Sequence, residues 1–135
     1  ARKQLEEKFS QKVLSIHFDD PNLIEANRAF LNKLKDIVIK HLSNADFSVN
    51  DLAENAFLSE RQLRRKINEL TKLSPLEFIR QIRLLKAKEL LENKVFFSIA
   101  EVSAAVGFNN PHYFSKVFKK LFGKTPQQFL GKHPN

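Results

Sequence analysis

Two stretches of this sequence place cationic and polar side chains at the spacing of one helix face. Both have them at positions i, i+3, i+4 and i+7, which a helix brings to one side. The first set is Arg61, Arg64, Arg65 and Asn68. The second set, at an offset of 51 residues, is His112, Ser115, Lys116 and Lys119. Guanidinium and ammonium groups bind phosphates, and on a helix in the major groove they hydrogen-bond to guanine edges. A single basic stripe is usually a solvated face, but two matched stripes favour duplex DNA as the partner.

The side opposite each stripe is apolar, as expected of a helix that packs on a core. The apolar positions are Leu63, Ile67 and Leu70 in the first stretch and Phe114, Val117, Phe118 and Leu121 in the second. The flanking sequence also recurs: residues 48–52 match 98–102 at an offset of 50, and one extra turn residue then shifts the offset to 51. Each copy has the pattern of a short helix, a tight turn, a second helix and a Ser/Thr-Pro helix start, which predicts a helix-turn-helix motif.

Helix starts are marked by a polar residue followed three positions later by an acidic or amide side chain, the pattern of a capping box. The pairs are Ser48/Asp51, Ser59/Gln62, Ser74/Glu77, Ser98/Glu101 and Thr125/Gln128, with Asn22/Glu25 as a weaker one. They predict helices near 23–42, 49–56, 60–71, 75–92, 99–106, 111–122 and 126–131. Apolar spacing predicts one further helix over about 4–15.

The predicted fold class is therefore all-α, with two three-helical, homeodomain-like helix-turn-helix subdomains joined by a long central helix. The expected division is a linker over 1–22 that follows an upstream regulatory domain, a first lobe over 23–74, a connecting helix over 75–92 and a second lobe over 93–135. A helix over 75–92 would be roughly 27 Å long. Such a connector suits two recognition helices about one DNA turn (~34 Å) apart.

Composition narrows the class of function. The chain has 135 residues, a net charge of +8 and no cysteine, which excludes a disulfide framework, a thiolate metal site and a cysteine nucleophile. The excess charge grows along the chain, from +1 over 1–47 to +3 over 48–94 and +4 over 95–135. No metal-binding histidine spacing and no Gly-rich phosphate loop is present, so we expect neither an enzyme nor a cofactor. No apolar stretch approaches the ~20 residues of a membrane span, so we expect no membrane contact by this segment. Because the chain begins at Ala1 and contains no methionine, we expect it to be part of a longer protein.

Two other classes of partner stay open on these observations. The 13 phenylalanines could line the groove of a helical protein-interaction module, although at helical spacing they are more typical of a core. A nonspecific nucleic-acid binder would also use the cationic stripes, whereas RNA recognition usually needs exposed aromatic rings for base stacking. Salt dependence separates a DNA binder from a protein-interaction module. Affinity for duplex DNA falls with a log–log slope near −0.9 per phosphate contact, whereas binding by a protein-interaction module should be nearly insensitive to salt.

From Phe47 to Lys132 the chain resembles the DNA-binding domain of the AraC-type transcription regulator family. The first half carries Ser48-Val49-(x)2-Leu52-Ala53, Leu58-Ser59-(x)3-Leu63-(x)3-Ile67 and Ser74-Pro75-(x)2-Phe78-Ile79. The second half is the more specific one and carries Val106-Gly107-Phe108, Tyr113-Phe114-Ser115-Lys116-Val117-Phe118-Lys119-Lys120 and Gly123-Lys124-Thr125-Pro126-(x)2-Phe129. The sequence departs from the family pattern at Phe57 and Lys72, where glycine is expected, and at Pro111. At Phe57 the departure predicts a turn of another type and an altered angle for helix 60–71.

The resemblance implies a seven-helix, two-lobed unit whose recognition helices enter successive major grooves, in a transcription activator. We expect a cytoplasmic location, which the absence of cysteine fits, although the full-length protein could be anchored in a membrane. It further implies RNA polymerase as a partner and two protomers on repeated half-sites, paired through an upstream domain or residues 1–22. The run Leu5-Glu6-Glu7-Lys8-Phe9-Ser10 resembles connectors in response regulators and hybrid two-component sensors.

The resulting site prediction contains no catalytic residue and no metal ligand. The predicted DNA-binding residues of the first recognition helix are Arg61, Gln62, Arg64, Arg65 and Asn68. Those of the second are Asn110, His112, Ser115, Lys116 and Lys119. The predicted phosphate contacts are Ser48, Ser98 and Lys120.

Overall fold

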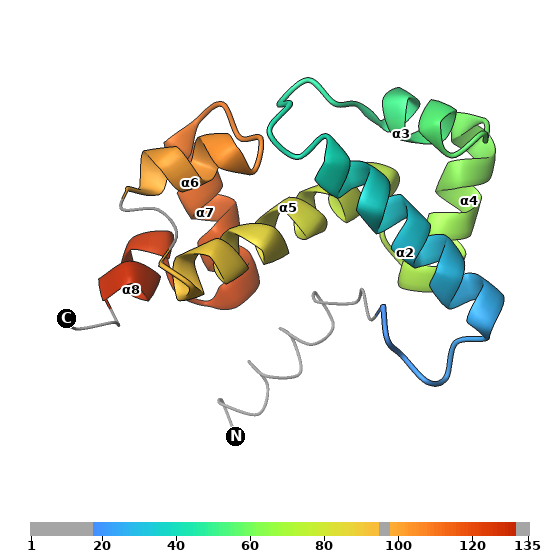
Figure 1. The fold of residues 1–135 in the computed structure, drawn as a ribbon, viewed down its shortest axis with the longest axis horizontal. Coiled ribbons are helices and arrows are strands. Elements are labelled where there is room, and N and C mark those ends of the chain that lie inside the picture. The colour runs from blue at the N-terminus through green and yellow to red at the C-terminus, as the bar shows by residue number, and fades with distance from the viewer. Residues whose placement is uncertain (1–17, 95–97, 132–135) are drawn as a thin grey trace. The chain divides into compact units, whose positions relative to one another are not determined.

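The computed structural model describes residues 18–94 and 98–131. The regular secondary structure within these residues is entirely helical (Figure 1). In chain order these are α2 (Glu25–Lys40), α3 (Val49–Asn55), α4 (Glu60–Thr71), α5 (Pro75–Glu92), α6 (Ile99–Ala105), α7 (Pro111–Phe122) and α8 (Pro126–Gly131). The predicted all-α class is confirmed, and the helix bounds agree with the predicted ones within two residues. The helix predicted over 4–15, and most of the linker predicted over 1–22, lie outside the described residues.

Capping boxes explain why most helices begin where the sequence predicts. The hydroxyls of Ser48 and Ser59 each accept a hydrogen bond from the backbone N–H three residues on. The N–H of each serine donates the reciprocal bond to the side-chain oxygen of that same residue, Asp51 or Gln62. The same pair of bonds starts α5 at Ser74 and α8 at Thr125. At Ser98 the reciprocal bond is different, because the Ser98 hydroxyl rather than its N–H donates to Glu101 Oε1, at 3.0 Å.

The weaker box predicted at Asn22 and Glu25 is wrong. Helix α2 begins after Ile24, whose side chain supplies no capping bond. The N–H of Asn22 instead donates to Asp20 Oδ1 at 2.9 Å, which closes a local turn ahead of the helix. The side chain of Asp20 thus acts on Asn22 in a turn, and the helix starts without a side-chain cap.

The described residues divide into two compact lobes. The first lobe consists of residues 18–41 and 46–82, and the second of residues 42–45, 83–94 and 98–131. Helix α5 contributes to both cores, with Phe78, Ile79 and Ile82 in the first and Leu84, Ala87 and Leu91 in the second. The segment 42–45 lies between α2 and α3 in sequence, yet it belongs to the second lobe.

The first-lobe core gathers the apolar faces of α2, α3, α4 and the first half of α5. Leu34 and Val38 of α2 and Leu63 and Ile67 of α4 are fully buried. Leu70, predicted on the same buried face, is partly buried and packs at the edge of this core. The apolar spacing of α4 therefore decides which side of the helix is left to solvent.

Aromatic rings make up much of the second-lobe core. Phe114 and Phe118 of α7 are fully buried, and their ring centroids lie 5.7 Å apart. The ring of Phe129 in α8 packs edge-on against that of Phe118, with the two ring centroids 5.5 Å apart. The ammonium of Lys88 lies 5.4 Å from the ring centroid of Phe122. The phenylalanines at helical spacing are thus core residues, as their spacing favoured.

The turns of the two helix-turn-helix motifs have the same backbone structure. In the first, the N–H of Phe57 donates to Glu54 O and that of Leu58 to Ala53 O, at 3.1 and 2.9 Å. In the second, 50 residues later, the bonds from Gly107 to Ala104 O and from Phe108 to Ser103 O have the same lengths. Phe57 has φ 59° and Gly107 has φ 87°, so both lie in the left-handed region. The expectation of another turn type at Phe57 is therefore wrong, because the packed helices impose this backbone on whichever residue stands there.

A buried arginine organises the second lobe. Arg83 of α5 is 5% exposed, and its Nη1 donates to Leu42 O at 2.7 Å and to Val106 O at 2.8 Å. Its Nη2 donates to Asn44 O at 2.9 Å. Burial lowers the pKa of this guanidinium, which nevertheless stays charged in proteins. Arg83 thus holds the 42–45 segment and the turn of the second helix-turn-helix motif together.

Candidate nucleic-acid interface

Helix α4 presents the first predicted set of DNA-binding residues to solvent. The exposed side chains are Arg61, Gln62, Arg64, Arg65 and Asn68, while Leu63 and Ile67 on the other side are completely buried. Gln62 has a structural task as well, since its Oε1 accepts a hydrogen bond from the N–H of Ser59 at 3.0 Å. Its amide NH2 group is the part that remains for a base or phosphate.

Helix α7 presents the second set in the same way. His112, Lys116 and Lys119 are exposed, and Ser115 is half-buried. Asn110, the N-cap residue, accepts hydrogen bonds through Oδ1 from the N–H groups of residues 112 and 113, at 2.9 and 3.1 Å. As with Gln62, the capping bond uses the amide oxygen and fixes the side chain at the start of the helix.

The predicted phosphate contacts lie at helix starts and at the end of a stripe. The Ser48 hydroxyl accepts from the N–H of Asp51, and the Asp51 carboxylate accepts from the N–H of Ser48 at 2.9 Å. The hydrogen bond from the Ser48 backbone N–H to the carboxylate, and after it the Ser48 side chain, lower the pKa of Asp51. Ser98 is likewise a capping residue, and Lys120 is exposed on α7. The phosphate contacts assigned to Ser48, Ser98 and Lys120 stay predictions.

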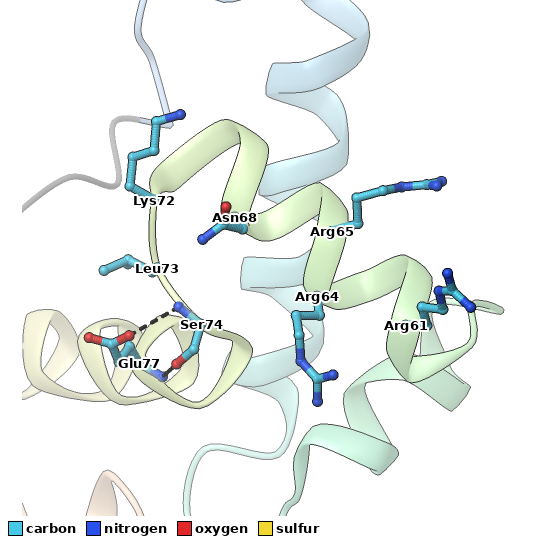
Figure 2. A pocket seen from close by; sticks show the side chains of 8 residues that line it. All are labelled: Arg61, Arg64, Arg65, Asn68, Lys72, Leu73, Ser74 and Glu77. Carbon is cyan, nitrogen blue, oxygen red and sulfur yellow. Dashed lines mark hydrogen bonds between the residues drawn. The ribbon is translucent and has the colours of Figure 1, made fainter.

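A cavity of about 490 Å³ follows the exposed side of α4 to the start of α5 (Figure 2). It is lined by Arg61, Arg64, Arg65, Asn68, Lys72, Leu73, Ser74 and Glu77. The structure thus brings four of the five residues predicted for the first recognition helix to one concave surface. Figure 2 shows Ser74 and Glu77 joined by their two capping bonds beneath the helix.

Four lining residues are absent from the predicted site, namely the apolar Leu73 and the polar Lys72, Ser74 and Glu77. Ser74 and Glu77 were assigned only to a helix cap, which they form. The repeat did single out Lys72 in the sequence, because this residue stands where the second copy has Gly123. Its backbone is left-handed, with φ 65° and ψ 13°, close to the φ 81° and ψ −8° of Gly123.

The cations of both stripes lack acidic partners within the described parts of the chain. There an ion pair joins Lys86 Nζ and Glu89 Oε2 at 3.3 Å, and none involves the arginines of α4 or the lysines of α7. Glu77 is the acidic residue at the cavity, and one of its oxygens is held by the N–H of Ser74 at 3.1 Å. Both stripes therefore present uncompensated positive charge, which suits a polyanion.

Comparison with known families agrees with this geometry. The sequence model of a family described as a helix-turn-helix domain matches residues 52–132. The chain belongs to the AraC-type helix-turn-helix family. This family comprises DNA-binding domains of transcription regulators, not enzymes. Its fold is the all-helical one described above.

Curated relatives of the AraC-type family are longer than this chain. It is 35% identical over 133 residues to histidine kinase P4 of Formosa agariphila, covering 98% of this chain and 10% of that protein. It is 33% identical over 117 residues to the HTH-type transcriptional activator RhaR of Pectobacterium carotovorum subsp. carotovorum, covering 87% of this chain and 40% of RhaR. The chain therefore spans less than half the length of either relative.

A solved AraC-type structure includes the nucleic acid. The DNA-binding domain of AdpA, a global transcriptional factor, in complex with a target DNA, superposes with a TM-score of 0.66 and 29% sequence identity. The match covers 76% of this chain and 90% of that domain.

Within the described residues no helix has the length and apolar character needed to cross a membrane.

Proposed function

We propose that this AraC-type domain binds double-stranded DNA in a sequence-specific manner, with α4 and α7 as recognition helices in successive major grooves. One observation carries the proposal. The second helix of each helix-turn-helix motif buries an apolar face and exposes a cationic face, and the two exposed faces match at an offset of 51 residues. A helix fits the major groove, whose base edges offer acceptors to arginine and lysine.

We assign base reading and phosphate binding to the exposed side chains of the two stripes. In the first groove these are Arg61, Gln62, Arg64, Arg65 and Asn68. In the second they are Asn110, His112, Ser115, Lys116 and Lys119, with Lys120 as a backbone contact. Arginine suits bidentate hydrogen bonds to guanine, and asparagine or glutamine suits adenine.

The domain serves, in our proposal, as the output end of a cytoplasmic transcription activator that contacts RNA polymerase. The name of the RhaR relative supports activation, and the near-complete overlap with part of a histidine kinase supports control by a two-component system. Pairing of two protomers through residues 1–22 or an upstream domain would place the domains on repeated half-sites. The expected division into a linker over 1–22, lobes over 23–74 and 93–135 and a connecting helix over 75–92 belongs to this proposal.

Selection of random double-stranded oligonucleotides with this domain, sequenced after several rounds at moderate salt, tests the proposal. Two short enriched blocks about 10 base pairs apart are expected for two helices that read one face of the duplex. A single block would restrict base reading to one helix. The absence of enrichment, with retained salt-dependent binding, would indicate a nonspecific nucleic-acid binder. The absence of any DNA binding would favour the alternative of a helical protein-interaction module.

Replacing Arg65 by alanine is expected to weaken binding to the selected site by ~1–3 kcal/mol and to relax the preference at one base pair. The reason is the loss of a bidentate donor to a guanine edge. Titrations by fluorescence anisotropy on the selected site and on its single-base variants measure both effects. Equal losses on selected and random DNA would make Arg65 a phosphate contact instead.

Lys66→Ala is the matched control for Arg65→Ala. It removes the same charge from the neighbouring position of α4, but the ammonium of Lys66 lies over the ring of Phe30, 4.7 Å from its centroid. We expect a smaller loss of affinity, with no change in base preference. A relaxed base preference in Lys66→Ala would contradict the assignment of the reading face.

A further inference from the structure

Lys72 ends the first recognition helix in a backbone conformation that favours glycine. It is the C-cap of α4, with φ 65° and ψ 13°. Any residue other than glycine carries a steric cost in this left-handed region of φ and ψ, because its Cβ approaches the following carbonyl oxygen. The corresponding C-cap of α7 is Gly123, which has φ 81° and ψ −8° and avoids that cost.

The turn itself gains nothing from the lysine side chain. The N–H of Lys72 donates to Asn68 O at 2.9 Å, and the N–H of Gly123 makes the equivalent bond to Lys119 O at 2.7 Å. Both helices therefore end with the same capping bond. The side chain of Lys72 is exposed and has no ion pair with any residue the structure describes. A strained residue of this kind points to a task outside the turn.

The position of Lys72 favours a DNA phosphate as its ligand. It lines the same cavity as Arg61, Arg64 and Arg65, and Figure 2 shows it beyond the last turn of α4, past Asn68. From Arg61 to Asn68 the helix advances about 10 Å, which fits within the ~12 Å major groove. From Arg61 to Lys72 it advances about 16 Å, so a helix axis that crosses the groove from Arg61 would place Lys72 beyond its ~12 Å width, level with the phosphates.

We propose that Lys72 binds a DNA backbone phosphate at the edge of the first groove, and that position 123 is the equivalent place at the second groove, where glycine omits this contact. This inference rests on the proposed DNA binding. Lysine suits the task, because its ammonium is a compact charge that binds phosphate without reading a base. The two recognition helices then differ in their share of nonspecific affinity as well as in the bases they read.

The structure allows the missing contact to be added to the second helix. A Cβ built on Gly123 meets no atom within 4 Å, so a side chain has room there. The left-handed backbone of Gly123 remains a cost for any replacement, and this cost is shared by Gly123→Ala and Gly123→Lys. The alanine variant therefore separates backbone strain from added charge.

The test measures the slope of log affinity against log salt concentration, on the selected duplex and on a scrambled one. Lys72→Ala is expected to reduce the magnitude of the slope by about 0.9 on both duplexes and to leave the ratio of the two affinities unchanged. Lys72→Arg should retain the slope of the wild type. Gly123→Lys should increase the magnitude of the slope by a similar amount relative to Gly123→Ala. Thermal unfolding of each variant confirms that it is folded under the binding conditions.

Each outcome bears on the inference separately from the proposed function. A wild-type protein without salt-dependent binding to duplex DNA would overturn the proposed function itself. A steep wild-type slope that Lys72→Ala leaves unchanged would show that Lys72 is only solvated. A loss confined to the selected duplex would make Lys72 a base reader, also against the proposal. An unchanged slope in Gly123→Lys would overturn the equivalence of the two positions.

Discussion

Replacing Arg83 by methionine is expected to lower the free energy of unfolding by about 3–5 kcal/mol. Methionine keeps a long apolar stem but donates no hydrogen bond. The carbonyls of Leu42, Asn44 and Val106 then lose donors at 2.7, 2.9 and 2.8 Å. A buried acceptor left without a partner costs about 1–3 kcal/mol, and access of water to the 42–45 segment recovers part of the sum. Urea unfolding followed by circular dichroism at constant pH measures the change.

Lys86→Met is the matched control, because it removes a cation from the same helix. The ammonium of Lys86 pairs with Glu89 at the surface, and such pairs contribute about 0–1 kcal/mol. Hydrogen exchange localises the effect of Arg83→Met. The amides of Gly107 and Phe108 should exchange faster, whereas those of Phe57 and Leu58 in the matching first turn should be unaffected. A change in stability below about 1 kcal/mol would contradict the assigned role of Arg83.

Replacing Gly107 by alanine is expected to lower the free energy of unfolding by a similar amount, about 3–5 kcal/mol. Two costs combine. The backbone at φ 87° disfavours any Cβ by about 1–2 kcal/mol. A Cβ would also overlap the guanidinium of Arg83 and the carbonyl oxygen of Leu42, so that hydrogen bonds worth about 1–3 kcal/mol each are displaced. The same urea titration measures the loss.

The other left-handed positions separate these two costs. Gly123→Ala has the backbone cost without the overlap, because nothing lies within 4 Å of its Cβ. This variant should lower the free energy of unfolding by only about 1–2 kcal/mol. Phe57→Gly relieves strain at a side chain that is 88% exposed, and should be neutral or stabilising by up to about 1 kcal/mol. When Gly107→Ala is made in the Arg83→Met variant, it should lower the free energy of unfolding by less than in the wild type, because the guanidinium that its Cβ would overlap is absent. Equal losses for Gly107→Ala and Gly123→Ala would disprove the overlap with Arg83.

The local sequence predicted much of the fold and of the candidate site. Helix starts were predictable because a capping box is completed within four residues, as at Ser48 and Ser59. The buried and exposed faces of α4 and α7 were predictable because apolar residues at helical spacing must face a core. The two cationic stripes, and the DNA-binding class they favour, followed from the same spacing and from the repeat. These features depend on neighbours along the chain, so a single sequence contains them.

Only the tertiary structure decided the features that depend on distant partners. The carbonyls that Arg83 binds lie 23–41 residues away in sequence, so its type and position gave no sign of a buried donor. The turn at Phe57 was predicted to change type, yet packing of the flanking helices imposes the left-handed backbone that its residue type disfavours. Lys72 joined the cationic cavity for the same reason, since the path from α4 to α5 sets where its side chain points. Local side-chain chemistry determined the elements and their faces, whereas packing over long sequence separations determined the strained turns, the buried arginine and the full extent of the basic surface.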